Sequence, residues 1–163
     1  MTTFSASYPS SANALTCTLA SLASSTTAGR SSTTMDNTTS KYEDYGFDVK
    51  LKTNGSAPTG EKGSYIYLAV SQDGTNLSGS SAEAVGTDVA VTFDTNTNLF
   101  GPYFLSMPAA STTYRWQSGS IAALIGFVPQ KACVIVNNQT GNALDSTAGN
   151  HSVTWSAFQR TSV

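Results

Sequence analysis

The sequence contains few charged residues, and this scarcity limits the partners that the protein can bind. Lys, Arg, Asp and Glu together account for 11% of the 163 residues, with a formal net charge of -2. Globular domains carry about 25% charged residues. Because electrostatic binding to nucleic acid needs a basic surface, we expect no nucleic-acid partner. The composition also excludes a coiled coil, which is rich in Ala, Glu, Lys and Leu.

Long apolar runs are missing as well. Apolar-rich runs such as residues 121–128 and 132–136 are much shorter than the roughly 18 residues that a membrane-spanning helix needs. The first residues, MTTFSASYP, lack the basic residues and the apolar segment of a secretory signal. We therefore expect that the chain is made in a cytoplasm and does not associate with a membrane.

Cysteine and histidine are scarce, which bears on metal binding and catalysis. Cys17 and Cys133 form neither a CxxC pair nor a cluster with a histidine, so we expect no metal site and no cofactor. Cytoplasmic synthesis favours two free, buried thiols over a disulfide between them. The single histidine, His151, has no nucleophile motif near it, and we interpret it as a turn or strand-start residue with ordinary hydrogen bonds.

A carboxylate cluster at residues 43–48 is the other candidate for catalysis. Asp44 and Asp48 share one face of a predicted strand, and glycosidases use paired carboxylates. A solvated strand face explains the same pattern, and we interpret the cluster in this way. The residues thus indicate no catalytic site, and we expect that the protein is not an enzyme.

Small hydroxyl residues are abundant, with 24 Ser and 23 Thr, and they alternate with apolar residues in short segments. An alternation with period two is typical of half-buried strands, and Thr suits a pleated, solvated surface. The clearest case is residues 45–51, where Tyr45, Phe47, Val49 and Leu51 share one face. Similar signals predict strands at residues 15–19, 30–35 (an edge strand), 65–70 (buried on both faces), 89–93, 99–107 (a bulge or edge position), 114–117, 132–136 and 153–157, whereas 121–128 is ambiguous between helix and strand.

About eight short strands separated by frequent turns predict an all-β fold. We expect an antiparallel two-sheet β-sandwich of the jelly-roll type, because eight strands fill that architecture. The Ser-rich residues 1–13 are predicted to be an N-terminal arm, and residues 14–163 a single β-sandwich domain.

Aromatic residues offer two alternative roles. Trp155 is in phase with Val153 and Ala157 and is expected in the core, whereas Trp116 follows Arg115 near a turn and is expected at a subunit contact. With neighbouring tyrosines, Trp116 could instead form a platform on which sugars stack. A carbohydrate-binding module is therefore the alternative of another class.

Three stretches carry a resemblance: DNTTSKY (36–42), FVPQKA (127–132) running into NNQTGNAL (137–144), and STAGNH (146–151). In this order they resemble a group of tailed-bacteriophage virion structural proteins of similar length. The resemblance implies no catalytic residues. By analogy of size and fold, it implies a capsid decoration (cement) protein on the capsid exterior.

We therefore expect a non-enzymatic virion protein, made in the host cytoplasm, that stabilises the capsid lattice. The expected partners are the major capsid protein and further copies of the same chain, for example as a trimer. Candidate contact residues are Phe4 and Tyr8 in the arm, and Arg115 and Trp116. A tail or head-fibre subunit of the same particle is a further alternative.

Overall fold

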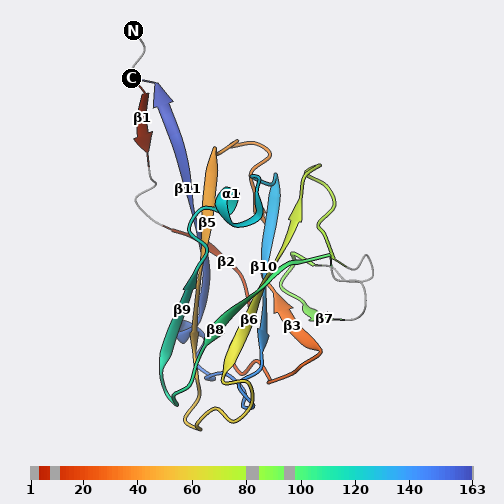
Figure 1. Ribbon diagram of the computed structural model, residues 1–163, viewed down its shortest axis with the longest axis vertical. Helices are drawn as coiled ribbons and strands as arrows, with labels where there is room; N and C mark the ends of the chain where they lie inside the picture. The colour runs from red at the N-terminus through yellow and green to blue at the C-terminus, as the bar shows by residue number, and fades with distance from the viewer. Residues whose placement is uncertain (1–3, 8–11, 80–84, 94–97, 163) are drawn as a thin grey trace.

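The computed structural model describes residues 4–7, 12–79, 85–93 and 98–162, and this part of the chain is all-β (Figure 1). The strands are β1 (Phe4–Ser7), β2 (Asn13–Leu15), β3 (Ala28–Ser31), β4 (Met35–Asp36), β5 (Asp44–Lys52), β6 (Gly63–Ser71), β7 (Ala90–Thr92), β8 (Phe100–Ser106), β9 (Thr113–Gln117), β10 (Lys131–Asn138) and β11 (Ser152–Ser162). A short helix, α1 (Ile121–Ile125), precedes β10, and a 3-10 turn, η1 (Ala148–Asn150), precedes β11.

The strands form two antiparallel sheets that face each other as in a β-sandwich (Figure 1). One sheet has the order β1-β11-β5-β9, with β2 also paired to β11. The other has the order β7-β3-β10-β6-β8, with β4 also paired to β10. The predicted all-β, two-sheet antiparallel architecture is thus confirmed, with short strands added to the expected eight.

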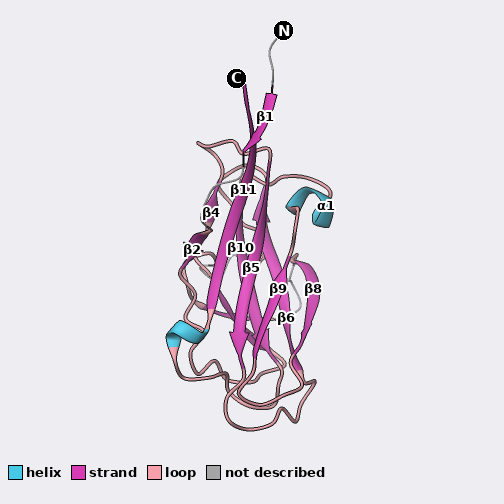
Figure 2. Ribbon diagram, turned by 90° about the vertical axis from the view of Figure 1, so that its left-hand side faces the viewer, coloured by secondary structure: helices cyan, strands magenta, loops and turns pink. Residues whose placement is uncertain are grey.

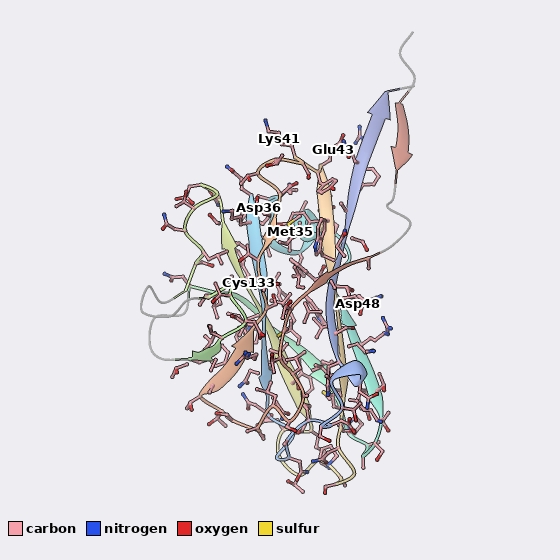
Figure 3. The ribbon with its side chains drawn as sticks, turned by 180° about the vertical axis from the view of Figure 1, so that it is seen from behind. Met35, Asp36, Lys41, Glu43, Asp48 and Cys133 are labelled. Carbon is pink, nitrogen blue, oxygen red and sulfur yellow. The ribbon has the colours of Figure 1, made fainter. Side chains whose placement is uncertain are left out.

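The main core lies between the two sheets. Strand β5 alternates as its sequence predicts, with Tyr45, Phe47, Val49 and Leu51 buried and the residues between them half-buried. These side chains pack against Ile66, Leu68, Val134 and Val136 of the facing sheet, and Met35 points into the same interior (Figure 3). Each buried side chain of this size stabilises the fold by roughly 1.5–3 kcal/mol.

A second apolar cluster covers the opposite face of the six-stranded sheet. Ala69, Val91, Cys133 and Ile135 are buried there. The side chains packed against them come partly from the connection between β6 and β8, namely Leu77, Val85, Val89, Phe93 and Leu99, together with Tyr67. Strands β6 and β10 are therefore covered on both faces, which agrees with their nearly continuous apolar sequences.

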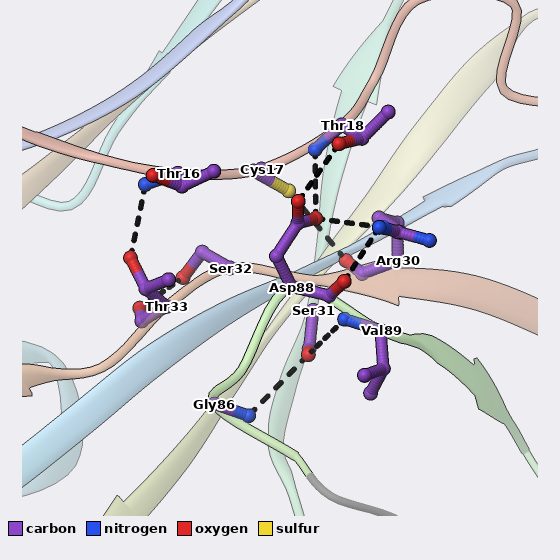
Figure 4. A network of polar contacts seen from close by, with 10 residues as sticks. All are labelled: Thr16, Cys17, Thr18, Arg30, Ser31, Ser32, Thr33, Gly86, Asp88 and Val89. Atoms are coloured by element: carbon purple, nitrogen blue, oxygen red, sulfur yellow. Dashed lines mark hydrogen bonds and ion pairs between the residues drawn. The ribbon is translucent and has the colours of Figure 1, made fainter.

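A polar network fastens this covering segment to the sandwich (Figure 4). The Asp88 carboxylate accepts hydrogen bonds from Thr18 N (2.8 Å), Thr18 Oγ1 (2.7 Å) and Arg30 Nε (2.7 Å). Burial alone would raise the pKa of Asp88, but these bonds hold it below its ordinary value. The backbone of Asp88 has a φ of 58°, in the left-handed region that Asp tolerates better than most residues.

Two predicted strands differ from the structure. Strand β2 ends at Leu15, so most of the predicted strand at 15–19 is not part of a sheet. The reason is that its N–H groups bond to side chains: Thr16 N donates to Thr33 Oγ1 (2.9 Å) and Thr18 N to Asp88. Side chains have replaced the neighbouring strand as hydrogen-bond partners.

The predicted edge strand at 30–35 is wrong in two respects. Strand β3 ends at Ser31 and lies between β7 and β10, so it is not an edge. The chain then leaves the regular ladder because Ser32 Oγ accepts from Val134 N (3.0 Å) while Ser32 N donates to Val134 O (2.8 Å). A side-chain oxygen here takes the place of a backbone carbonyl.

The ambiguous stretch at 121–128 begins as a helix. Ser120 Oγ accepts from Ala123 N (2.9 Å), and Gly126 ends α1 in the left-handed conformation. An N-cap serine and a left-handed glycine are common helix-end signals. Ile121 is fully buried and anchors α1 to the core.

We predict that Asp88→Ala lowers the free energy of unfolding by about 2–3 kcal/mol, because a partly buried charged acceptor of three hydrogen bonds is removed. Asp88→Asn is the matched control, since it keeps an oxygen acceptor and tolerates the same backbone conformation, and its loss should be smaller. Urea unfolding measures both. Equal stability of Asp88→Ala and the wild type would contradict the role assigned to this network.

Candidate functional site

An open groove of about 530 Å³ lies along the outer face of the five-stranded sheet, over β5, β9 and β11. Its size falls in the range of pockets that bind small ligands. The polar and aromatic side chains along it include Asp44, Asp48, Arg115, Gln117, Ser156 and Phe158. Strand alternation places these residues on the face opposite to the core.

The floor of the groove requires a glycine. A Cβ at Gly46 would lie 1.8 Å from the carbonyl oxygen of Gly119, so no other residue fits at this position without displacing that loop. The loop is held down because Phe47 N donates to Ser118 Oγ (2.8 Å) and Ser118 N donates to Phe47 O (2.9 Å). The loop therefore passes directly over β5 at Gly46, near the start of the strand, and forms one wall of the groove.

An ion pair defines the polar part of the groove. Asp48 lies on the outer side of the sheet (Figure 3) and accepts from Arg115 Nη1 at 3.1 and 3.0 Å and from Gln117 Nε2 at 2.6 Å. The Asp48 side chain is 18% exposed, whereas that of Arg115 is 58% exposed. Arg115 and Gln117 are therefore held by the carboxylate and still reach solvent, where they can donate hydrogen bonds to a ligand.

The structure places the predicted contact residues Arg115 and Trp116 on opposite faces of β9. Arg115 lines the groove, whereas its neighbour Trp116 is on the opposite face, partly buried against the core. The Trp116 ring stacks on Tyr103, with a centroid distance of 5.4 Å and an interplanar angle of 28°. This stack occupies one face of the indole, on which a sugar would otherwise stack.

Of the predicted arm, β1 lies at the end of its sheet opposite to η1 (Figure 2). Phe4 belongs to β1, where its backbone pairs with Ser162 of β11. Tyr8 lies outside the described residues. Asn13, the last residue of the predicted arm, is in β2 and pairs with Trp155.

Phe104 is an aromatic residue that the sequence analysis did not single out. It is 48% exposed and packs on Tyr65 with a centroid distance of 5.2 Å. A Cβ at Gly63 would lie 2.4 Å from the Phe104 ring, so the ring rests directly on the glycine backbone. Its position one residue after Tyr103, which packs against the core, was the available signal, because consecutive strand residues face opposite sides.

His151 makes ordinary structural hydrogen bonds, as predicted. Its Nδ1 accepts from Lys52 N (3.3 Å), and its Nε2 is 2.9 Å from the carbonyl oxygen of Asp145. Both ring nitrogens are thereby engaged by backbone groups. Since one partner donates and the other accepts, they match the neutral imidazole with its proton on Nε2.

The two candidate carboxylates serve separate partners. Asp44 Oδ1 accepts from Tyr45 N (2.8 Å) and from Ala122 N (3.2 Å) at the start of α1, whereas Asp48 binds Arg115 and Gln117. Four residues along a strand span about 13 Å, which is wider than the roughly 5–9.5 Å between glycosidase carboxyl groups. Their geometry matches structural roles.

Both cysteines are free thiols, in agreement with the sequence-based prediction. Burial raises the pKa of Cys17 and of Cys133 to about 12, so both thiols are neutral at physiological pH. Within the described ranges, no group of three or more His, Cys, Asp or Glu residues is placed to hold a metal ion. The same residues contain no helix of sufficient length and apolarity to cross a bilayer.

Comparison of the chain with protein-family models, curated proteins and solved structures finds no match.

We predict that the fold loses stability below pH 4 partly through Asp145. Bonds from Asn150 Nδ2 (2.7 Å) and Thr147 N (2.9 Å) lower the Asp145 pKa from 3.8 to about 2. Because the folded pKa is the lower one, this contribution is complete above pH 3.8 and disappears as the pH falls to about 2. Urea midpoints measured across this pH range should fall less steeply for Asp145→Asn than for the wild type. Parallel curves would contradict the assignment.

Proposed function

We propose that this chain is a non-enzymatic structural protein of a bacteriophage virion, placed on the capsid exterior as a decoration protein. Its partners are the major capsid protein and further copies of itself. The proposal starts from the resemblance of three stretches to virion structural proteins. Two features of the fold add support, namely the order of the strands and the position of the chain ends.

The strand pairing supports a jelly-roll assignment. With β1, β4 and β7 left aside, eight strands remain, and among their pairs are β2 with β11, β3 with β10, β5 with β9, and β6 with β8. The pairs β5 with β11 and β6 with β10 join these into the two sheets. The first strand thus pairs with the eighth, the second with the seventh, the third with the sixth, and the fourth with the fifth. A long antiparallel hairpin rolled into two sheets has this pairing, and jelly rolls of this kind are used by capsid proteins and lectins.

The observation that carries the proposal is a two-stranded ribbon formed by both chain ends. Strand β1 pairs with residues 159–162 of β11, and this ribbon extends beyond the body of the sandwich (Figures 1 and 2). A projecting ribbon offers backbone hydrogen-bonding groups to a neighbouring molecule. It therefore suits a protein whose task is to dock.

Docking of this kind would stabilise a capsid by mass action. A ligand that binds the assembled lattice and not its free subunits shifts the equilibrium toward the lattice. Several weak contacts within one oligomer would add through their high effective concentration. Small contacts such as a four-residue strand are then sufficient.

We predict that deletion of residues 2–7 lowers the amount bound to capsids about tenfold, since one of several linked contacts is lost. The deletion stops before Asn13, because β2 is part of the sheet. Co-sedimentation with capsids prepared without this chain measures binding, and thermal unfolding verifies the fold. Undiminished binding of the shortened chain would refute this role of the ribbon. No binding by the full chain would refute the decoration role, and a few copies at one vertex would indicate a tail or fibre subunit.

The second candidate function is carbohydrate binding, and the groove is the observation that favours it. Asp48, Arg115 and Gln117 present an acceptor and donors to a neutral polyol, and the aromatic residue Phe158 lines the same groove nearer to Asp44, with which it pairs. We expect a glycan array to detect binding that Asp48→Ala abolishes and that Phe104→Ala, which lies on the other sheet, leaves intact. An array without any bound glycan would remove this candidate.

A further inference from the structure

We infer that the outer edge of β1 is a self-association edge, at which two copies of this chain pair their β1 strands antiparallel about a two-fold axis. The product is a continuous four-stranded sheet, with the two β1 strands in the centre and one β11 on each side. The inference deepens the self-association in the proposed function, because it names the surface. It is testable without capsids.

Among the described edge strands, β1 has neither a charge nor a proline, and its length of four residues is its one protective feature. Natural proteins protect open edges with short strands, charges or proline. Strands β2 and β7 have three residues each, β8 contains Pro102, and β9 carries Arg115. Strand β1 has four residues and reads Phe-Ser-Ala-Ser, with no charge and no proline. Strands β2 and β7 also lack both, but they are one residue shorter.

The ribbon is also incomplete as a structural unit. The pairing of β11 with β5 ends at Phe158 and Asp44, so residues 159–162 pair with β1 alone. A two-stranded ribbon is marginally stable in water and gains stability from further strands. A third and a fourth strand would provide the missing partners.

The other side of the ribbon is less suited to this pairing. Arg160 Nε lies 3.2 Å from Glu43 Oε2, and Glu43 is located just before β5, beside the base of the ribbon (Figure 3). This ion pair marks the side of β11 that faces β5, away from β1. Among the described residues, β1 pairs with β11 alone, so the backbone groups of β1 that point away from β11 have no strand partner there.

A second copy of the chain fits the outer edge of β1, because two identical strands can pair there antiparallel about a two-fold axis. Antiparallel pairing of two β1 strands places Phe4 opposite Ser7 and Ser5 opposite Ala6, so no like charges oppose each other. Strand β1 runs from the tip of the ribbon toward the body (Figure 2). The two bodies would then lie at opposite ends of an overlap of about 14 Å, where they do not collide.

The first test is the oligomeric state of the full chain by sedimentation velocity over a wide concentration range. We expect a reversible monomer–dimer equilibrium and a chain without residues 2–7 that stays monomeric. An interface of four residues per copy is small, so the equilibrium should shift toward dimers only at high concentration. A full chain that is monomeric throughout, or a shortened chain that dimerises equally well, would overturn the inference. A trimer that depends on β1 would also overturn it, because β1 would then pair with the free edge of β11.

A charge exchange tests the pairing itself. The double substitution Ser5→Lys with Ala6→Lys places like charges opposite each other at both central pairs, and should weaken dimerisation about tenfold. Ser5→Glu with Ala6→Glu should have the same effect, and an equimolar mixture of the two variants should restore dimers. Ser56→Lys with Ala57→Lys, in an exposed loop at the other end of the molecule, is the matched control. A mixture that stays monomeric while the control dimerises would refute antiparallel pairing.

The two proposals fail in different ways. A monomer that still binds capsids would refute the self-association edge and leave the decoration role in place. A dimer that does not bind capsids would support the self-association edge and refute the decoration role.

Discussion

Burial of strand β10 on both of its faces is the constraint from which the rest of the fold follows. Residues 132–138 are all buried, so each face needs its own apolar cover. The facing sheet supplies one cover, and the connection between β6 and β8 supplies the other. In its described residues, that connection has one short strand, β7, and the Asp88 network holds it in place.

Neutral polar side chains, rather than charged ones, make many of the hydrogen bonds that hold the loops of this protein. Asn137 and Asn138, at the end of β10, are fully buried, and their amide nitrogens donate to backbone carbonyls of four other residues: Ser25 and Ala28, and Leu22 and Asn142. Loops that would otherwise expose unpaired backbone groups are closed in this way. The low charge of the sequence is thus compatible with a well-connected structure, and leaves an exterior of small hydroxyl groups.

The sequence predicts the fold correctly where the alternation of buried and exposed residues depends on one strand alone. Tyr45 to Leu51 alternate because one face of β5 meets the core, and this requires no knowledge of the neighbours. The breaks at Thr16 and Ser32 were not accessible, because distant groups at Thr33 and Val134 decide them. The ribbon was hidden for the same reason, since it joins residues 4–7 to residues 159–162. Of the site residues, Arg115 was named as a subunit contact through its neighbour Trp116, whereas the role of Gly46 follows only from the loop that crosses it.

The groove and the ribbon lie on one continuous strand, which links the two candidate functions. Phe158 lines the groove, and the next residue of β11 begins the ribbon. A partner strand on β1 would extend the same sheet and restrict the motion of β11 at this junction, so it would also order one end of the groove. The groove itself lies on the broad outer face of the sheet, away from the β1 edge. In the proposed pairing, a partner strand on β1 therefore leaves the groove, with Asp48 and Arg115, uncovered.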